Sequence, residues 1–188
     1  MAKSFSLPSL PFNSPHSITS HLPKISCSST SIQSQSAKRE LLTLISDQER
    51  GLKTQRNPQK LALIVKSVDA LASLARNSVT TDDSLSATWR LLWTTEKEQL
   101  FIVEKAHLFG TQAGDVLQVI DVEKRSLNNV ITFPPDGVFF VRSTIEIASS
   151  QRVDFRFESV YLDDEIRVVK DIRGDYLIVE RAPYTWKE

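Results

Sequence analysis

Residues 152–158 read RVDFRFE, and this stretch decides the fold because its charged and apolar residues alternate. A period of two is that of a β-strand with one face in water and the other against a core. Similar strand-like runs occur along the second half of the chain, at residues 87–94, 99–104, 116–122, 128–133, 138–147, 165–170 and 176–181. Short turns separate these runs, and no helix is predicted between them. The sequence therefore predicts a mainly β fold, in which eight antiparallel strands over residues 85–182 form an up-and-down barrel.

Two amphipathic helices are predicted ahead of the barrel, within residues 40–76. Apolar residues recur at helical spacing from about residue 38 to 53 and again from residue 58 to about 76. Asn57 can cap the second helix, and Pro58 suits a first helical position. The polar face of this helix carries few bases. We therefore expect its apolar stripe to pack against the barrel rather than to enter a membrane surface.

The first 39 residues contain no Asp or Glu and are rich in Ser. An acid-free, hydroxyl-rich leader with few arginines is typical of a chloroplast transit peptide. Residues 25–27, ISC, resemble the end of a processing site, which places the mature start near Ser28. The alternative is a tail that is merely disordered. On this basis residues 1–39 are predicted to be a disordered leader and residues 40–188 a single folded domain.

The composition of residues 40–188 excludes several function classes. These 149 residues suffice for one domain, and their 19 Lys and Arg against 23 Asp and Glu give a net charge of −4. An acidic body argues against nucleic acid as a partner. The one cysteine, Cys27, lies within the predicted leader, and His107 is the one histidine outside it. Residues 40–188 therefore cannot build a metal cluster from Cys or His ligands. No phosphate loop or nucleophile elbow is present, so neither an enzyme nor a bound cofactor is expected.

Large apolar residues on two predicted strands are the candidate ligand contacts. With strict alternation, each strand points three of them to one face: Trp89, Leu91 and Trp93 on the first, and Val153, Phe155 and Phe157 on the other. Such rings could line a pocket for a lipid or isoprenoid chain. The alternative is that they fill a closed core, since small barrels are often solid.

Arg167 is a further candidate because it lies in an otherwise apolar strand, IRVV at residues 166–169. If its side chain points inward, it needs a partner, either Asp163 or the headgroup of a ligand. Alternation alone does not decide between this orientation and an outward, solvated one. The neighbouring DDE at residues 163–165 is predicted to form a turn or ion pairs rather than a metal site.

Two longer stretches carry a resemblance to a known family. Residues 85–95, LSATWRLLWTT, resemble the first barrel strand of the plastid lipid-associated proteins, also called plastoglobulins or fibrillins. Residues 161–179, YLDDEIRVVKDIRGDYLIV, are similar to the closing hairpin of that family. Ala87 stands where the family usually has Gly, so the chain resembles a divergent member.

The resemblance implies a lipocalin-like barrel in the plastid, at thylakoids or plastoglobules, with the stroma as a further location. It also implies that the protein binds or organises hydrophobic small molecules such as prenylquinones, carotenoids or acyl lipids. The alternative is a structural protein of thylakoid or globule surfaces without a ligand, or an accessory partner of an isoprenoid-metabolism enzyme.

Overall fold

The computed structural model describes residues 27–153 and 157–187. Its helices are α1 (Cys27–Ile45), α2 (Pro58–Leu74) and α3 (Lys97–Lys105), with short 3₁₀ turns η1 (Thr54–Arg56), η2 (Asp83–Leu85) and η3 (Ala106–Phe109). Its strands are β1 (Ala87–Thr94), β2 (Val116–Asp121), β3 (Ser126–Phe133), β4 (Gly137–Thr144), β5 (Arg152–Val153), β6 (Phe157–Leu162), β7 (Ile166–Asp171) and β8 (Tyr176–Arg181).

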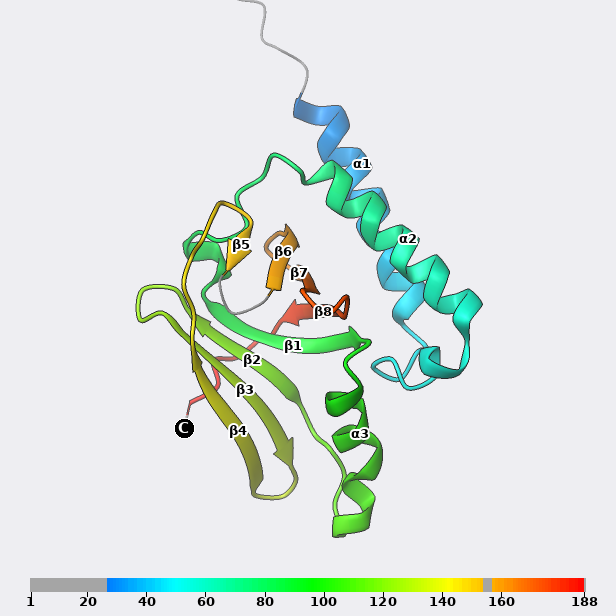
Figure 1. The fold of residues 1–188 in the computed structure, drawn as a ribbon, viewed down its shortest axis with the longest axis vertical. Coiled ribbons are helices and arrows are strands. Elements are labelled where there is room, and N and C mark those ends of the chain that lie inside the picture. Colours follow the sequence, from blue (N-terminus) through cyan, green and yellow to red (C-terminus); the bar gives the residue numbers. More distant parts are fainter. Residues whose placement is uncertain (1–26, 154–156, 188) are drawn as a thin grey trace, which may run out of the picture.

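The strands form one antiparallel sheet of eight, in the order β4-β3-β2-β1-β8-β7-β6-β5, which confirms the predicted mainly β architecture. The sheet curls into a half-barrel (Figure 1). Its ladder does not continue from β4 to β5, because β5 has only two residues and offers little edge to an eight-residue strand. A single bridge between Ile147 and Val153 joins the two ends there. The concave side of the sheet is therefore more open than in a fully paired barrel.

The prediction of a strand at residues 99–104 is wrong, because this segment lies in α3. Leu100 is fully buried and its neighbour Phe101 is exposed, so the burial follows one side of a helix. A short apolar run does not separate helix from strand by periodicity alone. The number of strands is still eight, because residues 152–158 contribute both β5 and the start of β6, with residues 154–156 outside the described part of the chain.

Helices α1 and α2 pack against one another and against the convex side of the sheet (Figure 1). As predicted, Pro58 begins α2, and the Asn57 side chain accepts a hydrogen bond of 2.9 Å from the backbone N–H of Lys60. The first helix begins earlier than predicted, at Cys27, so the proposed domain boundary at residue 40 lies inside α1.

An irregularity in β1 divides its large side chains between the two faces of the sheet. Opposite β8, Leu91 pairs with Val179 and Trp93 pairs with Ile178, so β1 has one residue more than its partner here. Such a bulge reverses the alternation of the residues that follow it. Leu91 consequently lies in the concave core and Trp93 in the helix-covered core, and the prediction that they share a face is wrong.

Candidate functional site

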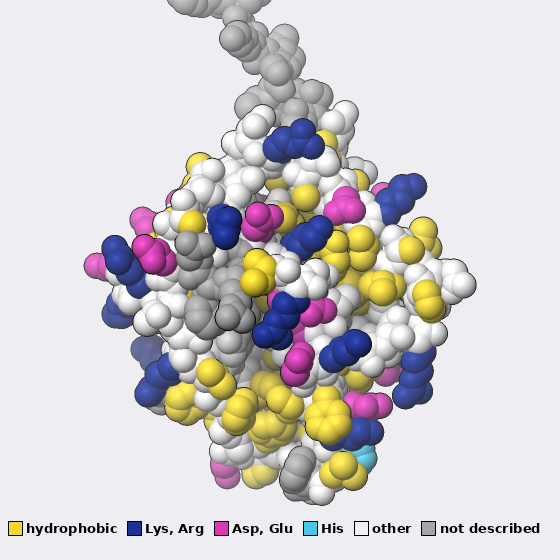
Figure 2. All heavy atoms as spheres, in the orientation of Figure 1, with side chains coloured by type: hydrophobic (Ala, Val, Ile, Leu, Met, Phe, Trp, Pro, Cys, Tyr) yellow, Lys and Arg dark blue, Asp and Glu magenta, His cyan; other side chains and the backbone are white. Residues whose placement is uncertain are grey.

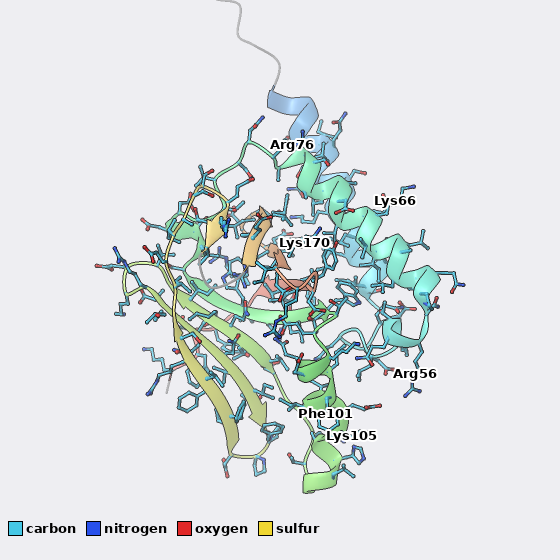
Figure 3. The ribbon with its side chains drawn as sticks, viewed as in Figure 1. Arg56, Lys66, Arg76, Phe101, Lys105 and Lys170 are labelled. Carbon is cyan, nitrogen blue, oxygen red and sulfur yellow. The ribbon has the colours of Figure 1, made fainter. Side chains whose placement is uncertain are left out.

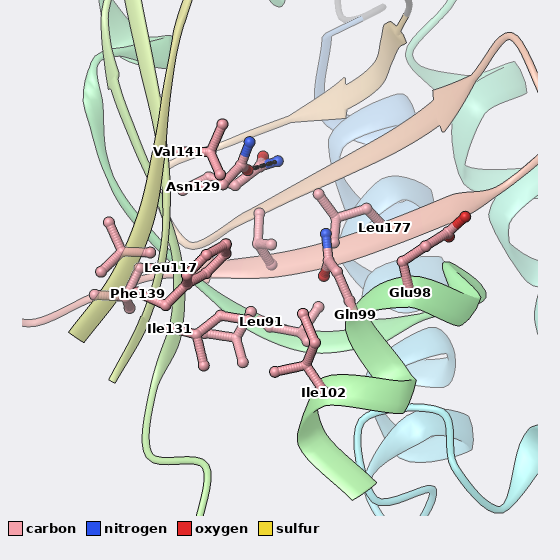
Figure 4. A pocket seen from close by; sticks show the side chains of 14 residues that line it. Leu91, Glu98, Gln99, Ile102, Leu117, Asn129, Ile131, Phe139, Val141 and Leu177 are labelled. Atoms are coloured by element: carbon pink, nitrogen blue, oxygen red, sulfur yellow. Dashed lines mark hydrogen bonds between the residues drawn. The ribbon is translucent and has the colours of Figure 1, made fainter. Parts of the chain in front are cut away.

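A cavity of about 230 Å³ lies on the concave side of the sheet, beneath α3 (Figure 4). Its walls come from β1, β2, β3, β4 and β8, together with Glu98, Gln99 and Ile102 of α3. Most of the lining is aliphatic, including Leu91, Val116, Ile131 and Val179. The cavity arises because α3 rests on side chains at the concave face and does not fill the curl of the sheet.

A second hollow of about 190 Å³ adjoins this cavity and shares Glu98, Gln99, Gln118, Asn129 and Leu177 with it. Its far end is formed by charged side chains at and beside the turn between β7 and β8: Glu96, Asp171, Arg173 and Asp175. The concave side therefore holds a trough with one apolar and one polar end.

Arg167 lies inside the half-barrel and is fully buried. Its Nη2 donates a hydrogen bond to Oε1 of Gln118 on β2. The Asp163 carboxylate, which was one predicted partner, binds Lys38 instead, at 2.7 Å. Because burial disfavours the charged form, the pKa of Arg167 falls to about 9. The guanidinium still remains a cation at neutral pH. Its burial and its contact with Gln118 show the inward orientation, one of the two that the sequence left open.

The predicted aromatic contacts do not line the cavity together. Trp89 is fully buried in the concave core, where its Nε1 donates to the carbonyl of Leu85 at 2.9 Å and its ring centroid is 4.5 Å from Cζ of Arg181. Trp93 lies on the convex side, where its Nε1 donates to Oγ1 of Thr54 at 3.0 Å. Of the first set, Leu91 is the residue that lines the cavity.

The second predicted set is described only in part. Val153 is buried in the same concave core as Trp89. The backbone of Phe157 belongs to β6, but its side chain and the whole of Phe155 lie outside the described residues. Neither Val153 nor Arg167 is among the residues that line the cavity.

The sequence prediction missed several cavity residues, most of them polar. Gln99 and Ile102 were missed because their segment was predicted to be a strand rather than α3. For Gln118 and Asn129 a signal was present, since each is a polar residue among inward positions that are otherwise apolar. Their opposed positions in β2 and β3 needed the register, which the sequence alone did not supply.

Glu96 lies where β1 leads into α3, and its carboxylate accepts a hydrogen bond from Nε2 of Gln99. Burial is the largest cause of a rise in the pKa of Glu96 to about 7, and the nearby carboxylates of Asp175 and Asp171 add to it. The polar end of the trough thus has a group that titrates near neutral pH.

Exposed apolar side chains lie beside the cavity at the end of the molecule formed by β4 and α3 (Figure 2). We call this surface the apolar rim, and its members are Phe101, Val138, Phe139, Phe140 and Val141. Lys105 is next to Phe101 on α3 (Figure 3). Phe139 and Val141 also line the cavity, so the rim is continuous with it. Contiguous exposed apolar surface of this kind marks an interaction site.

The PAP_fibrillin family profile matches residues 35–160, which is more than half of the chain. The chain belongs to the PAP_fibrillin family. The matched part includes α2, α3 and the strands up to β6 that form most of the cavity wall. Membership confirms the resemblance seen in the sequence and a role associated with plastid lipids.

One relative of this PAP_fibrillin protein is the "Probable plastid-lipid-associated protein 11, chloroplastic" of Arabidopsis thaliana. It is 62% identical over 187 residues, and the alignment covers 88% of each chain. This relative confirms the plastid location that the composition of the leader indicated. No solved structure matches the chain.

Two further observations on this PAP_fibrillin protein concern the described residues only. None of their helices combines the length and apolar character that crossing a membrane requires. Nor do three or more of their His, Cys, Asp or Glu side chains come together where they could hold a metal ion.

Proposed function

We propose that this protein binds one end of a hydrophobic plastid molecule, such as a prenylquinone, carotenoid or acyl lipid, in the cavity beneath α3. The observation that carries the proposal is an aliphatic cavity, continuous with an exposed apolar rim. Binding sites for small molecules are concave and mostly apolar, with a few polar groups that orient the ligand. The role is that of a binding module without catalysis.

The size of the cavity indicates how much of a ligand it can hold. Sites that enclose a whole drug-sized ligand have volumes of roughly 300–1,000 Å³. The cavity here has about 230 Å³, and the adjoining hollow about 190 Å³. We therefore expect a ring or the end of a chain to lie inside, with the remainder of a long molecule leaving over Phe139 and Val141.

The apolar rim supports a location at a lipid surface. Phe101 is 62% exposed and Phe139 is 51% exposed, which is unfavourable in water and favourable in a lipid monolayer. Lys105 beside Phe101 can place its amine among anionic headgroups while its methylenes cover apolar surface. The protein would then contact lipid through the same end at which its ligand enters.

The test is to fill the cavity without disturbing its surroundings. Ile102→Trp places a large ring in the cavity from α3, whereas Ile172→Trp places the same ring at an exposed turn and serves as the control. Decyl-plastoquinone, a carotenoid and a galactolipid are titrated into the full chain, with bound compound quantified after size-exclusion chromatography. We expect saturable binding of at least one compound, about tenfold weaker in Ile102→Trp and unchanged in Ile172→Trp. No saturable binding of any compound would support the structural role without a ligand.

A further inference from the structure

Three polar side chains form a chain of hydrogen bonds across the interior of the half-barrel. The guanidinium of Arg167 on β7 donates to Oε1 of Gln118 on β2. The Nε2 of Gln118 then donates to Oδ1 of Asn129 on β3 at 3.0 Å. Gln118 and Asn129 are opposite one another in the ladder, so their side chains are on the same face. Both of these amides line the cavity and the adjoining hollow.

The arrangement fixes which way each amide points. A guanidinium has donors and no acceptor, so Gln118 must turn its oxygen toward Arg167 and its NH₂ toward Asn129. Asn129 in turn must present its oxygen to Gln118. The NH₂ group of Asn129 is then the free end of the chain, and within residues 27–153 and 157–187 it has no recorded acceptor. The orientation of an amide is usually ambiguous, but here the buried cation removes the ambiguity.

We propose that Asn129 forms a subsite for an oxygen that accepts a hydrogen bond, so that the cavity selects apolar molecules carrying a carbonyl group over pure hydrocarbons. This inference rests on the proposed function, and it names the chemical class that the cavity prefers. A quinone, ketone or ester oxygen satisfies the Asn129 donor, whereas a hydrocarbon offers that donor no acceptor. Leaving a polar group of a site unpaired is what makes such sites reject an analogue that lacks the matching group.

Gln99, across the trough, does not impose the same selection. Its Nε2 donates to Glu96, which leaves Oε1 buried without a partner among the described residues. The orientation of this amide depends on the protonation of Glu96, because a neutral carboxyl group can donate whereas a carboxylate only accepts. Asn129 is anchored through Gln118 by Arg167, which is a cation without an acceptor at neutral pH, so the Asn129 donor persists there.

The experiment compares two probes of similar size, 2-decyl-1,4-benzoquinone and decylbenzene. Each is delivered to the full chain from a cyclodextrin, and protein-bound compound is measured after size-exclusion chromatography. Asn129→Leu removes the donor and keeps a side chain of similar volume. Asn128→Leu is the matched control, because it makes the same change one residue earlier on β3, on the opposite face of the sheet. Thermal unfolding followed by circular dichroism shows that each variant is folded.

We expect the wild type to bind the quinone about tenfold more tightly than the hydrocarbon, because one hydrogen bond contributes about this factor to an affinity. In Asn129→Leu the ratio should approach one, because quinone binding weakens while decylbenzene binding does not. Asn128→Leu should keep the ratio of the wild type. Equal binding of both probes by the wild type, or an unchanged ratio in Asn129→Leu, would overturn the subsite and leave the proposed function standing. Binding of neither probe would overturn the subsite, and the carotenoid and galactolipid titrations above would then decide the proposed function.

Discussion

The Nζ of Lys38 lies 2.7 Å from Oδ2 of Asp163, so α1 is tied to the turn between β6 and β7. Lys38 is almost completely buried, and a second contact of 2.8 Å joins it to Glu165. Burial alone would lower the pKa of Lys38, but the hydrogen bonds to Asp163 and Glu165 outweigh it and raise the pKa. Lys38 lies in the acid-free segment that was predicted to be a leader, and it is nevertheless part of the folded structure.

Replacing Lys38 should destabilise the fold. Lys38→Met removes the cation and leaves the mostly buried carboxylate of Asp163 without its partner, which we expect to lower the free energy of unfolding by about 2–4 kcal/mol. Arg39→Met is the control, because Arg39 is the next residue on α1 and its side chain is exposed. Urea denaturation at pH 7 measures both. Equal stability of Lys38→Met and the wild type would show that the contact does not hold α1 in place.

The position at which the leader is removed should matter for stability. A mature protein that begins near Ser28 keeps nearly all of α1, whereas one that begins at residue 40 loses Lys38 and its ion pairs. We expect the form that begins at Ser28 to melt at a clearly higher temperature than the form that begins at residue 40. Intact-mass measurement of the protein from chloroplasts should find the N-terminus near Ser28. Recovery of an uncleaved Met1 form from chloroplasts would contradict import with a transit peptide.

Trp93 should contribute to stability but not to ligand binding, since it lies on the convex side. Trp93→Phe keeps most of its buried surface and removes the hydrogen bond to Thr54, at a cost of about 1–2 kcal/mol. Quinone affinity, measured as for the cavity variants, should stay within twofold of the wild type. A large loss of affinity with unchanged stability would place Trp93 in the binding site after all.

The stability of the protein should fall between about pH 5 and pH 7. The pKa of Glu96 is about 7 in the folded protein, above its ordinary value of 4.5, so the folded state holds this proton more tightly. Protonated Glu96 therefore stabilises the folded state. This contribution is complete below pH 4.5, the ordinary pKa, and is lost as the pH rises through 7. Allowing for solvent screening, the loss should be on the order of 1–2 kcal/mol.

Glu96→Gln tests the origin of this pH dependence, because the variant stays neutral at every pH. Its melting temperature should exceed that of the wild type at pH 8 and should change less between pH 5 and 8. Burial and the surrounding Asp171, Asp175 and Glu98 oppose the charged form, while Arg173 favours it. If Glu96→Gln kept the full pH dependence, one of these neighbouring groups would be responsible.

Binding to lipid should depend on the apolar rim. Phe101→Ser combined with Phe140→Ser removes two rim side chains that do not line the cavity. Flotation with vesicles of galactolipid and an anionic lipid should show at least a severalfold loss of bound protein. The control, Leu63→Ser combined with Ile172→Ser, changes exposed apolar residues outside the rim and should float like the wild type. Equal losses in both pairs would assign the binding to general surface hydrophobicity.

Much of the fold could be predicted from periodicity. The described ends of residues 152–158 belong to β5 and β6, as strand-like alternation predicts, and the Asn57–Pro58 pair specifies the start of α2. Charge composition did not predict that Lys38 takes part in the fold. The structural role of Lys38 depends on Asp163, more than a hundred residues away, and composition carries no record of such a contact.

The candidate site was less predictable because its geometry depends on small irregularities. One extra residue between Leu91 and Trp93 moves Trp93 to the other side of the sheet, and no local sequence rule announces such a bulge. The run at residues 99–104 is apolar enough for a strand and becomes α3 through tertiary packing of Leu100. The polar inward positions of Gln118 and Asn129 were visible in the sequence, but their contact required the register of β2 and β3.

The open edge at β4 has a consequence for handling the protein. An exposed edge strand presents unpaired backbone groups to any other extended chain, and Phe139 and Phe140 add adhesive surface on both of its faces. Two copies in plain buffer can therefore pair edge to edge through β4, while the two-residue β5 at the other end offers little edge for further copies. The fraction of dimer should rise with protein concentration in the absence of lipid. A lipid surface that covered β4 would then prevent this association of the folded protein, in addition to being the surface at which the protein acts.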